Sequence, residues 1–129
     1  GYIIKYVQQM APHLPIISVP GVTSYQAAAA AVNMSLVEGE ESLLVLSGAE
    51  GGERLRELTN APDTVVFLKA YKNCEDITSA LEETDLLENS VAVSRVSLPD
   101  QEIYPRADLL CERAPKYWTL VIAKKKKNG

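Results

Sequence analysis

Four short runs of apolar residues constrain the fold of this chain more than any other feature of its sequence. They are LLVLS, TVVFLKAY, SVAVSRVSL and YWTLVIAK, at residues 43–47, 64–71, 90–98 and 117–124. Each has the length of a buried strand, and the segments between the first three carry helical patterns. Strands that alternate with helices predict an α/β fold with a mixed, mostly parallel sheet flanked by helices.

Weaker patterns indicate the remaining elements. The start of the chain, GYIIKYVQQM, has the apolar spacing of an amphipathic helix. A short strand is predicted at 16–19, and Thr23 or Ser24 can cap a helix that runs to about residue 32. The segment QEIYPRADLLCERAP, at 101–115, fits either a strand or a short helix.

Two more helices are expected after the first two apolar runs. A short helix follows the glycine turn in GAEGGERLRELTN, with Leu55 and Leu58 facing the core. A second helix, DITSALEET, opens at Asn73 or Glu75 and presents apolar residues on one face.

The glycine turn GAEGGER also resembles a phosphate-binding loop. Glycines between a strand and a helix can aim backbone N–H groups at an anion. The GxxxxGK[ST] pattern is absent, however, and Glu50 and Glu53 would repel a phosphate group. A plain turn is therefore the favoured interpretation.

The charge distribution argues against nucleic acid as a partner. The net charge is -4, but the lysines at 124–127 supply four of the 13 basic residues, which leaves nine against 17 acidic residues elsewhere. A body charge of about -8 does not suit a polyanion, and KKKKNG is interpreted as a solvated tail. No apolar run approaches the roughly 20 residues that span a membrane, so no membrane partner is expected.

The cysteines and the histidine do not form a recognisable catalytic or metal centre. Cys74 and Cys111 lack CxxC or Cys/His spacing and are interpreted as reduced thiols of a cytoplasmic protein. His13 lies between prolines, where a linker role is favoured over that of a catalytic base. Because no GxSxG turn accompanies it, a Ser/His/Asp hydrolase is not supported.

Three loops carry polar residues beside the ends of predicted strands, at 19–24, 69–71 and 94–100. In parallel α/β sheets, ligands bind in the crevice outside the carboxyl ends of the strands. We therefore expect these loops to contribute to one ligand site. For Lys69 taken alone, an ordinary strand-end lysine with a packed stem and a solvated ammonium is favoured.

Taken together, these segments resemble the second domain of the tetrapyrrole methylases, the S-adenosylmethionine-dependent enzymes of corrin and sirohaem synthesis. That domain opens with a Pro-Gly-Val/Ile-Thr/Ser-Ser motif, an alanine-rich helix and a strand, which are similar to VPGVTSYQAAAAAVNMSLVEGEESLLVLSG. Its later blocks resemble TVVFLKAYKNCEDITSAL, SVAVSRVSLPDQEIY and YWTLVIAK. The series covers the chain from residue 16 onward and is most similar to precorrin-2 and cobalt-precorrin-2 C20-methyltransferases.

The resemblance implies a particular domain organisation. Family members carry an N-terminal domain with a Gly-Asp-Pro motif that has no counterpart here, and the first helix starts without an N-cap. We therefore expect residues 1–19 to be a remnant helix and interdomain linker, and residues 20–129 to be the C-terminal domain. Such a fragment is expected to be inactive alone, and upstream coding sequence without a Gly-Asp-Pro loop would contradict this interpretation.

The resemblance also implies one wall of a cofactor site. Family members bind S-adenosylmethionine in the cleft between the two domains, with the segment equivalent to 117–120 near the adenine. The implied cofactor-binding residues are Thr23, Ser24, Leu68, Lys69, Ser94, Arg95, Tyr117, Thr119 and Leu120. No general base is identified and no metal site is expected.

The implied reaction is methyl transfer from S-adenosylmethionine to C20 of precorrin-2 or cobalt-precorrin-2 in cobalamin biosynthesis. Such a displacement depends mainly on positioning, and a dry apolar cleft favours loss of the sulfonium charge. The alternatives are another corrin-ring or uroporphyrinogen methyltransferase, and a non-catalytic binding module that reuses the domain. Because family members pair into homodimers, self-association of the chain is expected.

Overall fold

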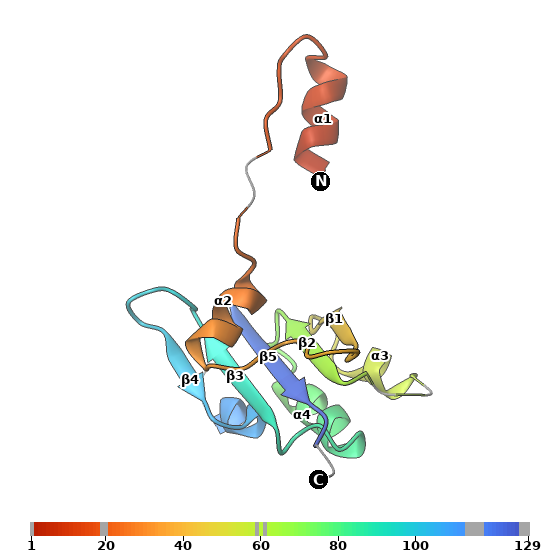
Figure 1. The fold of residues 1–129 in the computed structure, drawn as a ribbon, viewed down its shortest axis with the longest axis vertical. Coiled ribbons are helices and arrows are strands. Elements are labelled where there is room, and N and C mark those ends of the chain that lie inside the picture. Colours follow the sequence, from red (N-terminus) through yellow and green to blue (C-terminus); the bar gives the residue numbers. More distant parts are fainter. Residues whose placement is uncertain (1, 19–20, 59, 61, 113–117, 127–129) are drawn as a thin grey trace.

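One five-stranded sheet organises the chain (Figure 1). The computed structural model describes residues 2–18, 21–58, 60, 62–112 and 118–126. In order across the sheet, the strands are β1 (Leu43–Ser47), β2 (Thr64–Leu68), β5 (Thr119–Lys124), β3 (Ser90–Ser94) and β4 (Glu102–Tyr104). Helices flank this mixed sheet, so the predicted α/β class is confirmed.

The sheet is less parallel than expected. β1 and β2 pair in parallel, but β5 lies between β2 and β3 and runs against both, while β4 runs against β3. The expectation of a mostly parallel sheet is therefore wrong for the three pairs that involve β5 or β4. Apolar runs indicate where strands lie, but not in which direction each strand runs in the sheet. β1, β2 and β3 still point the same way, so their carboxyl ends and the start of β5 share one edge, which we call the strand-end edge.

One face of the sheet, the closed face, is covered by α3 (Glu53–Arg56), α4 (Cys74–Glu83) and the 3-10 helix η1 (Ala107–Glu112). Its largest buried apolar side chains, each at most 1% exposed, are Leu55, Phe67, Ile77, Leu81 and Leu86. Leu55 faces the core as predicted. Leu58 does not, and is 40% exposed, because α3 has already ended at Arg56.

The other face, the open face, is covered by α2 (Ser24–Ala31), whose Ala28 and Ala29 are buried against apolar strand residues. Alanine has no bulk beyond Cβ, so it favours the helix and lets it lie close to the sheet. Of the two caps considered, Thr23 is the N-cap: its hydroxyl accepts from the backbone N–H of Gln26, and the Gln26 side chain accepts from the N–H of Thr23. This reciprocal capping box fixes where the helix begins.

The segments at both ends of the sequence complete the fold. α1 (Tyr2–Met10) has no buried residue and stands clear of the sheet in Figure 1. The strand expected at 16–19 is not formed at residues 16–18, which pair with no strand, and residue 19 lies outside the described part. The ambiguous segment 101–115 contains both alternatives, because β4 is followed by η1.

Three strands are shorter than their apolar runs predict. β2 ends at Leu68, β3 ends at Ser94 and β5 begins at Thr119. The next residues outward, Lys69, Arg95 and Trp118, have φ angles of 56°, 52° and 59°. This left-handed conformation is incompatible with a continuing strand, so the chain turns sharply at these positions.

Candidate functional site

The strand-end edge concentrates backbone strain. Lys69, Arg95 and Trp118, which adopt the left-handed conformation, flank three adjacent strands there. A non-glycine residue in this conformation costs on the order of 1–3 kcal/mol and persists where surrounding contacts hold it. Backbone hydrogen bonds supply such contacts: Arg95 N–H donates to the Trp118 carbonyl at 3.0 Å, and Ala70 N–H donates to the Thr119 carbonyl at 3.0 Å. Clustered strain of this kind is typical of a functional site.

An open pocket of about 880 Å³ lies at this edge, between the strand ends and the start of α2. Its volume falls within the range of small-molecule sites. It is lined by Val22, Thr23, Ser24, Ala27, Ala49, Leu68, Lys69, Tyr71, Lys72, Val96, Ser97, Leu98, Trp118, Thr119 and Leu120. The three loops that the sequence analysis singled out therefore all reach one pocket.

The structure brings together most of the residues predicted to bind a cofactor. The pocket is lined by Thr23, Ser24, Leu68, Lys69, Thr119 and Leu120. Ser94 and Arg95 do not line it but lie directly behind lining residues, and Tyr117 is outside the described part of the chain.

Ser94 supports the pocket from within the sheet. Its hydroxyl lies 2.8 Å from the Thr119 hydroxyl, and both residues are at most 1% exposed. They face each other at the adjoining ends of β3 and β5. A buried hydroxyl pair satisfies two polar groups that would otherwise be costly to bury, so Ser94 orients Thr119 at the pocket wall.

Arg95 acts on the neighbouring wall residue, Trp118. Its guanidinium carbon lies 5.6 Å from the centroid of the Trp118 ring, within the range of a cation–π contact. Arg95 Nε also lies 2.6 Å from Asp100 Oδ2, in an ion pair that lacks the alignment of a hydrogen bond. Arg95 thus connects the β3 loop to the indole that borders the pocket.

Several lining residues were not singled out by the sequence. Trp118 falls within the segment 117–120 that the resemblance places near the adenine, but it was not named among the cofactor-binding residues. Ala27, Ala49 and Lys72 carried no sequence signal, because a small residue on a helix or in a turn looks like packing. Their role depends on the positions of α2 and of the β1–α3 turn, which sequence alone does not give.

The polar lining is cationic. Lys69 and Lys72 border the pocket, and none of its described lining residues is a carboxylate. The Lys72 ammonium lies 5.6 Å from the centroid of the Tyr71 ring, which restricts its position. The pocket therefore suits a ligand with an apolar or aromatic body and peripheral negative charge.

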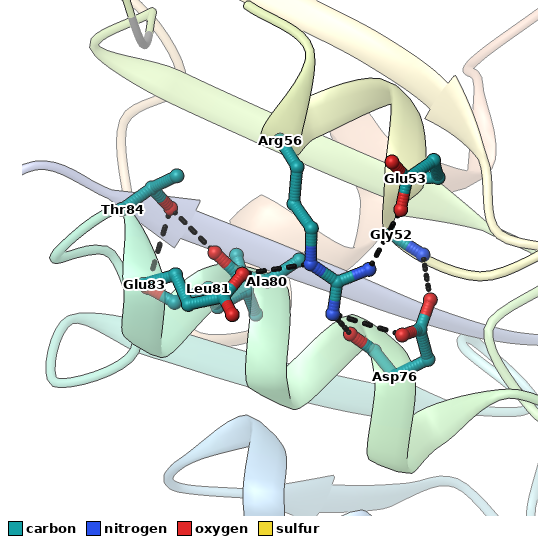
Figure 2. A network of polar contacts seen from close by, with 8 residues as sticks. All are labelled: Gly52, Glu53, Arg56, Asp76, Ala80, Leu81, Glu83 and Thr84. Carbon is teal, nitrogen blue, oxygen red and sulfur yellow. Dashed lines mark hydrogen bonds and ion pairs between the residues drawn. The ribbon is translucent and has the colours of Figure 1, made fainter.

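The glycine turn after β1 is held by an ionic brace, drawn in Figure 2. Arg56 Nη2 lies 2.8 Å from Asp76 Oδ1, and Arg56 Nε lies 2.7 Å from Glu83 Oε2. Asp76 Oδ2 accepts from the Gly52 N–H at 2.7 Å. These contacts join the turn and α3 to α4, and they lower the pKa of Asp76, chiefly through Arg56 and then through the Gly52 N–H.

This brace resolves the phosphate-loop alternative. The Asp76 carboxylate already occupies the position that an anion would take at the Gly52 N–H. The turn also packs closely on α4, since a Cβ at Gly52 would lie 2.5 Å from Ala80 Cβ. Asn73 donates from Nδ2 to the Ala49 carbonyl at 2.6 Å. The loop is therefore a plain turn, as favoured, and it fixes Ala49 in the pocket wall.

The remaining candidates lie away from the pocket. His13 is exposed in the segment after α1, and no group of metal-ligating side chains occurs among the described residues. Cys74 and Cys111 are free thiols, and burial together with the neighbouring Cys111 raises the pKa of Cys74 to about 12. A thiol with so high a pKa is not a nucleophile near neutral pH. Within the described part of the chain, no helix is long and apolar enough to cross a bilayer.

Comparison with known proteins identifies the family of this chain. The sequence profile of the Tetrapyrrole (Corrin/Porphyrin) Methylases matches residues 1–109. The chain belongs to the tetrapyrrole methylase family.

Individual relatives agree with this assignment. The chain is 38% identical to the cobalamin biosynthesis protein CobIJ of Mycobacterium tuberculosis (strain ATCC 25618 / H37Rv), over 81% of its own length and 20% of that protein. It is 31% identical to the cobalt-precorrin-2 C(20)-methyltransferase of Salmonella typhimurium, over 67% of its own length and 36% of the relative. The chain thus spans less than half of the curated relatives that it matches.

A solved structure supports the fold. The uroporphyrin-III C-methyltransferase of Thermus thermophilus, crystallised in complex with S-adenosyl homocysteine, superimposes with a TM-score of 0.67 at 21% identity. The match covers 96% of this chain and 58% of that one. At this identity the similarity establishes the architecture alone.

Proposed function

We propose that this chain is the C-terminal half of an S-adenosylmethionine-dependent methyltransferase that acts at C20 of precorrin-2 or cobalt-precorrin-2 in cobalamin biosynthesis. Residues 1–19 would then be the helix and linker from an N-terminal domain, and residues 20–129 the C-terminal domain. The observation that carries the proposal is the pocket at the strand-end edge, which collects Thr23, Lys69 and Thr119 in a chain of this family. A methylase relative with a bound S-adenosyl homocysteine supports the choice of cofactor.

The pocket residues suit one wall of a methyl-transfer site. Leu68, Leu120 and Val96 give it an apolar surface, which would favour loss of the sulfonium charge of S-adenosylmethionine once the rest of the site excludes water. Lys69 and Lys72 provide cations for the carboxylates of a tetrapyrrole substrate. S-adenosylmethionine supplies the methyl group, while these residues bind and orient. Because the wall is incomplete by itself, we propose that the chain alone is inactive.

One test of the cofactor assignment uses a substitution on α2 that fills the pocket. Ala27 lines the pocket, and Ala30, three residues along the same helix, is exposed. In calorimetric titrations of S-adenosyl homocysteine, we expect Ala27→Leu to raise the Kd about tenfold, as expected when a methylene-rich side chain crowds a site. Ala30→Leu is the matched control and should leave the Kd unchanged. Equal binding by both variants would contradict the assignment.

A second candidate is methylation at another carbon of the corrin ring. It is supported by the similarity to CobIJ, which is 38% identical to this chain, against 31% for the cobalt-precorrin-2 C(20)-methyltransferase. The two candidates are separated by supplying the whole protein with precorrin-2 and S-adenosylmethionine carrying a ¹³C methyl group. A labelled methyl at C20 supports the first candidate, and a label at another ring carbon supports the second.

We also propose that the whole protein is a cytoplasmic homodimer. The free thiols Cys74 and Cys111 agree with a reducing compartment. Exposed apolar side chains at Ile17 and Val22, which are 86% and 77% exposed, agree with surface that another domain or subunit covers. Sedimentation velocity tests this assembly: a monodisperse monomer at high concentration would contradict it.

A further inference from the structure

The two cysteines of the chain are far apart in the sequence but meet on the closed face. Cys74 is the first residue of α4 and Cys111 lies in η1, and these two helices pack against each other. Cys111 Sγ lies 3.6 Å from Thr78 Oγ1. Thr78 follows Cys74 by four residues on α4, so both side chains stand on the same face of that helix. The Cys111 thiol is therefore directed at the turn of α4 that begins with Cys74.

The two thiols are also close enough to influence each other. Burial is the largest cause that raises the pKa of Cys74 to about 12, and the Cys111 side chain is the next. Both are free thiols and only partly buried, so a small reagent can reach them. Burial beside the closed-face core disfavours the charged thiolate, whereas a disulfide carries no charge and loses nothing there. The surroundings of the pair therefore suit a sulfur–sulfur bond.

We propose that Cys74 and Cys111 form a reversible intramolecular disulfide, a redox-sensitive cross-link between α4 and η1 that is made by exchange with a low-molecular-weight disulfide. The inference does not depend on the proposed function, because the pair lies on the closed face. In a reducing compartment, disulfides are usually transient and redox-sensing, which fits two thiols that are free in the resting chain. Asn73, the residue before Cys74, holds Ala49 in the pocket wall. The cross-link would thus attach η1 to the segment that fixes this wall.

The exchange takes place in two steps. The Cys111 thiolate attacks one sulfur of the small disulfide, which forms a mixed disulfide and releases one small thiolate. Cys74 then attacks the Cys111 sulfur, loses its proton to solvent and releases the second small thiolate. In total the two cysteines lose two electrons and two protons, and the small disulfide is reduced to two thiols. Cys111 reacts first because the pKa of Cys74 is raised, and in the mixed disulfide Cys111 no longer bears a charge that contributes to this rise.

Mass spectrometry of the chain treated with glutathione disulfide tests the proposal. We expect the folded, unaltered chain to lose two hydrogens and to carry no glutathione. A peptide map without reductant should contain one linked pair that includes both cysteines, and dithiothreitol should separate it. Cys74→Ser should stop at a glutathione adduct on Cys111. Cys111→Ser should form its adduct on Cys74 at least about tenfold more slowly, because the raised pKa leaves little thiolate. Circular dichroism checks that each variant is folded.

Urea distinguishes a bond favoured by the fold from one made by chance. In urea that unfolds the chain, with the same excess of glutathione disulfide, we expect the share of the linked form to fall, because residues 75–110 then separate the thiols as a flexible loop. The linked chain should also have a Tm about 5–10 °C above that of the reduced chain, since the bond restricts the unfolded state.

Three results would overturn the inference while leaving the proposed function intact. One is a folded chain that ends with separate glutathione adducts on Cys74 and Cys111, or with a disulfide between two chains. Another is a linked share that is as high in urea as in the folded chain. The third is a linked chain whose Tm does not rise, because the bond would then join a distorted structure.

Discussion

The two faces of the sheet are built in opposite ways. The closed face is packed with large apolar side chains such as Phe67, Ile77 and Leu81, and an ionic brace ties its turn to α4. The open face is covered by a short alanine-rich helix, and beside it lies a pocket of about 880 Å³. Both faces belong to the same strands, so they differ in the helices and loops that pack against the side chains on each side.

This contrast indicates that the closed face stabilises the fold while the open face leaves space for a ligand. The dense packing and the brace lie on the closed face of the same strands whose ends carry Lys69, Arg95 and Trp118 in the left-handed conformation. The open face then leaves room for a ligand without loosening the core. A site on rigid elements holds its geometry better than one on loops alone.

The largest expected effect compares the same substitution on the two faces. Leu81 is fully buried on the closed face, whereas Leu68 is half-buried and lines the pocket. We expect Leu81→Ala to lower the free energy of unfolding by about 3 kcal/mol. Leu68→Ala should cost only about 1 kcal/mol, because part of that side chain already meets solvent. Urea denaturation measures both, and equal losses would show that the faces do not differ in packing.

A smaller effect tests how α2 is anchored on the open face. Thr23 caps the helix, and Ser24 is its first residue. We expect Thr23→Ala to lower the free energy of unfolding by about 1 kcal/mol, since the N–H of Gln26 loses its acceptor. Ser24→Ala is the control and should change it by less than about 0.5 kcal/mol. A larger loss in Ser24→Ala would place the cap one residue later.

The smallest effect concerns the brace and depends on pH. Arg56 and the Gly52 N–H hold the pKa of Asp76 below its ordinary value, so the folded state is stabilised above about pH 4, and this contribution disappears as the pH falls through the folded pKa. Because the Asp76 side chain is 46% exposed, solvent screens the pair, and Asp76→Asn should cost about 0.5 kcal/mol at pH 7.

The pH series gives this prediction its control. The difference between the unaltered chain and Asp76→Asn should shrink between pH 5 and pH 2 in thermal unfolding. Glu75→Gln removes an exposed carboxylate from the same turn of α4 and should show no such trend. A difference that stays constant with pH would mean that Asp76 acts through packing rather than charge.

The sequence predicts the elements of the sheet better than their connections. Apolar runs locate β1, β2, β3 and β5, because buried strands need continuous apolar residues whatever their direction. They do not reveal that β5 enters antiparallel between β2 and β3, since direction depends on the path of the whole chain. They also place the ends of β2 and β3 too far along the chain. The residues that follow these strands in the left-handed conformation, Lys69 and Arg95, are not glycines, so the sequence gives no signal of the turn.

The sequence predicts the parts of the candidate site that consist of polar loops beside the ends of strands. The loops at 19–24, 69–71 and 94–100 were expected beside strand ends, and each contributes to the pocket. Ala49 and Ala27 were not predictable, because their role comes from where the brace and the capping box hold their backbone. Thr23 was expected at the cofactor site from the resemblance, and the structure shows its hydroxyl capping α2.

The central claim, that the open-face pocket holds the adenosine-containing cofactor, is tested most directly by amide NMR of the ¹⁵N-labelled chain titrated with S-adenosyl homocysteine. We expect the amide resonances of Lys69, Ala49 and Thr119 to shift saturably, and that of Lys125, beyond the far end of β5, to stay in place. Shifts confined to the surroundings of Lys125, or no saturable shift at the strand-end edge, would contradict it.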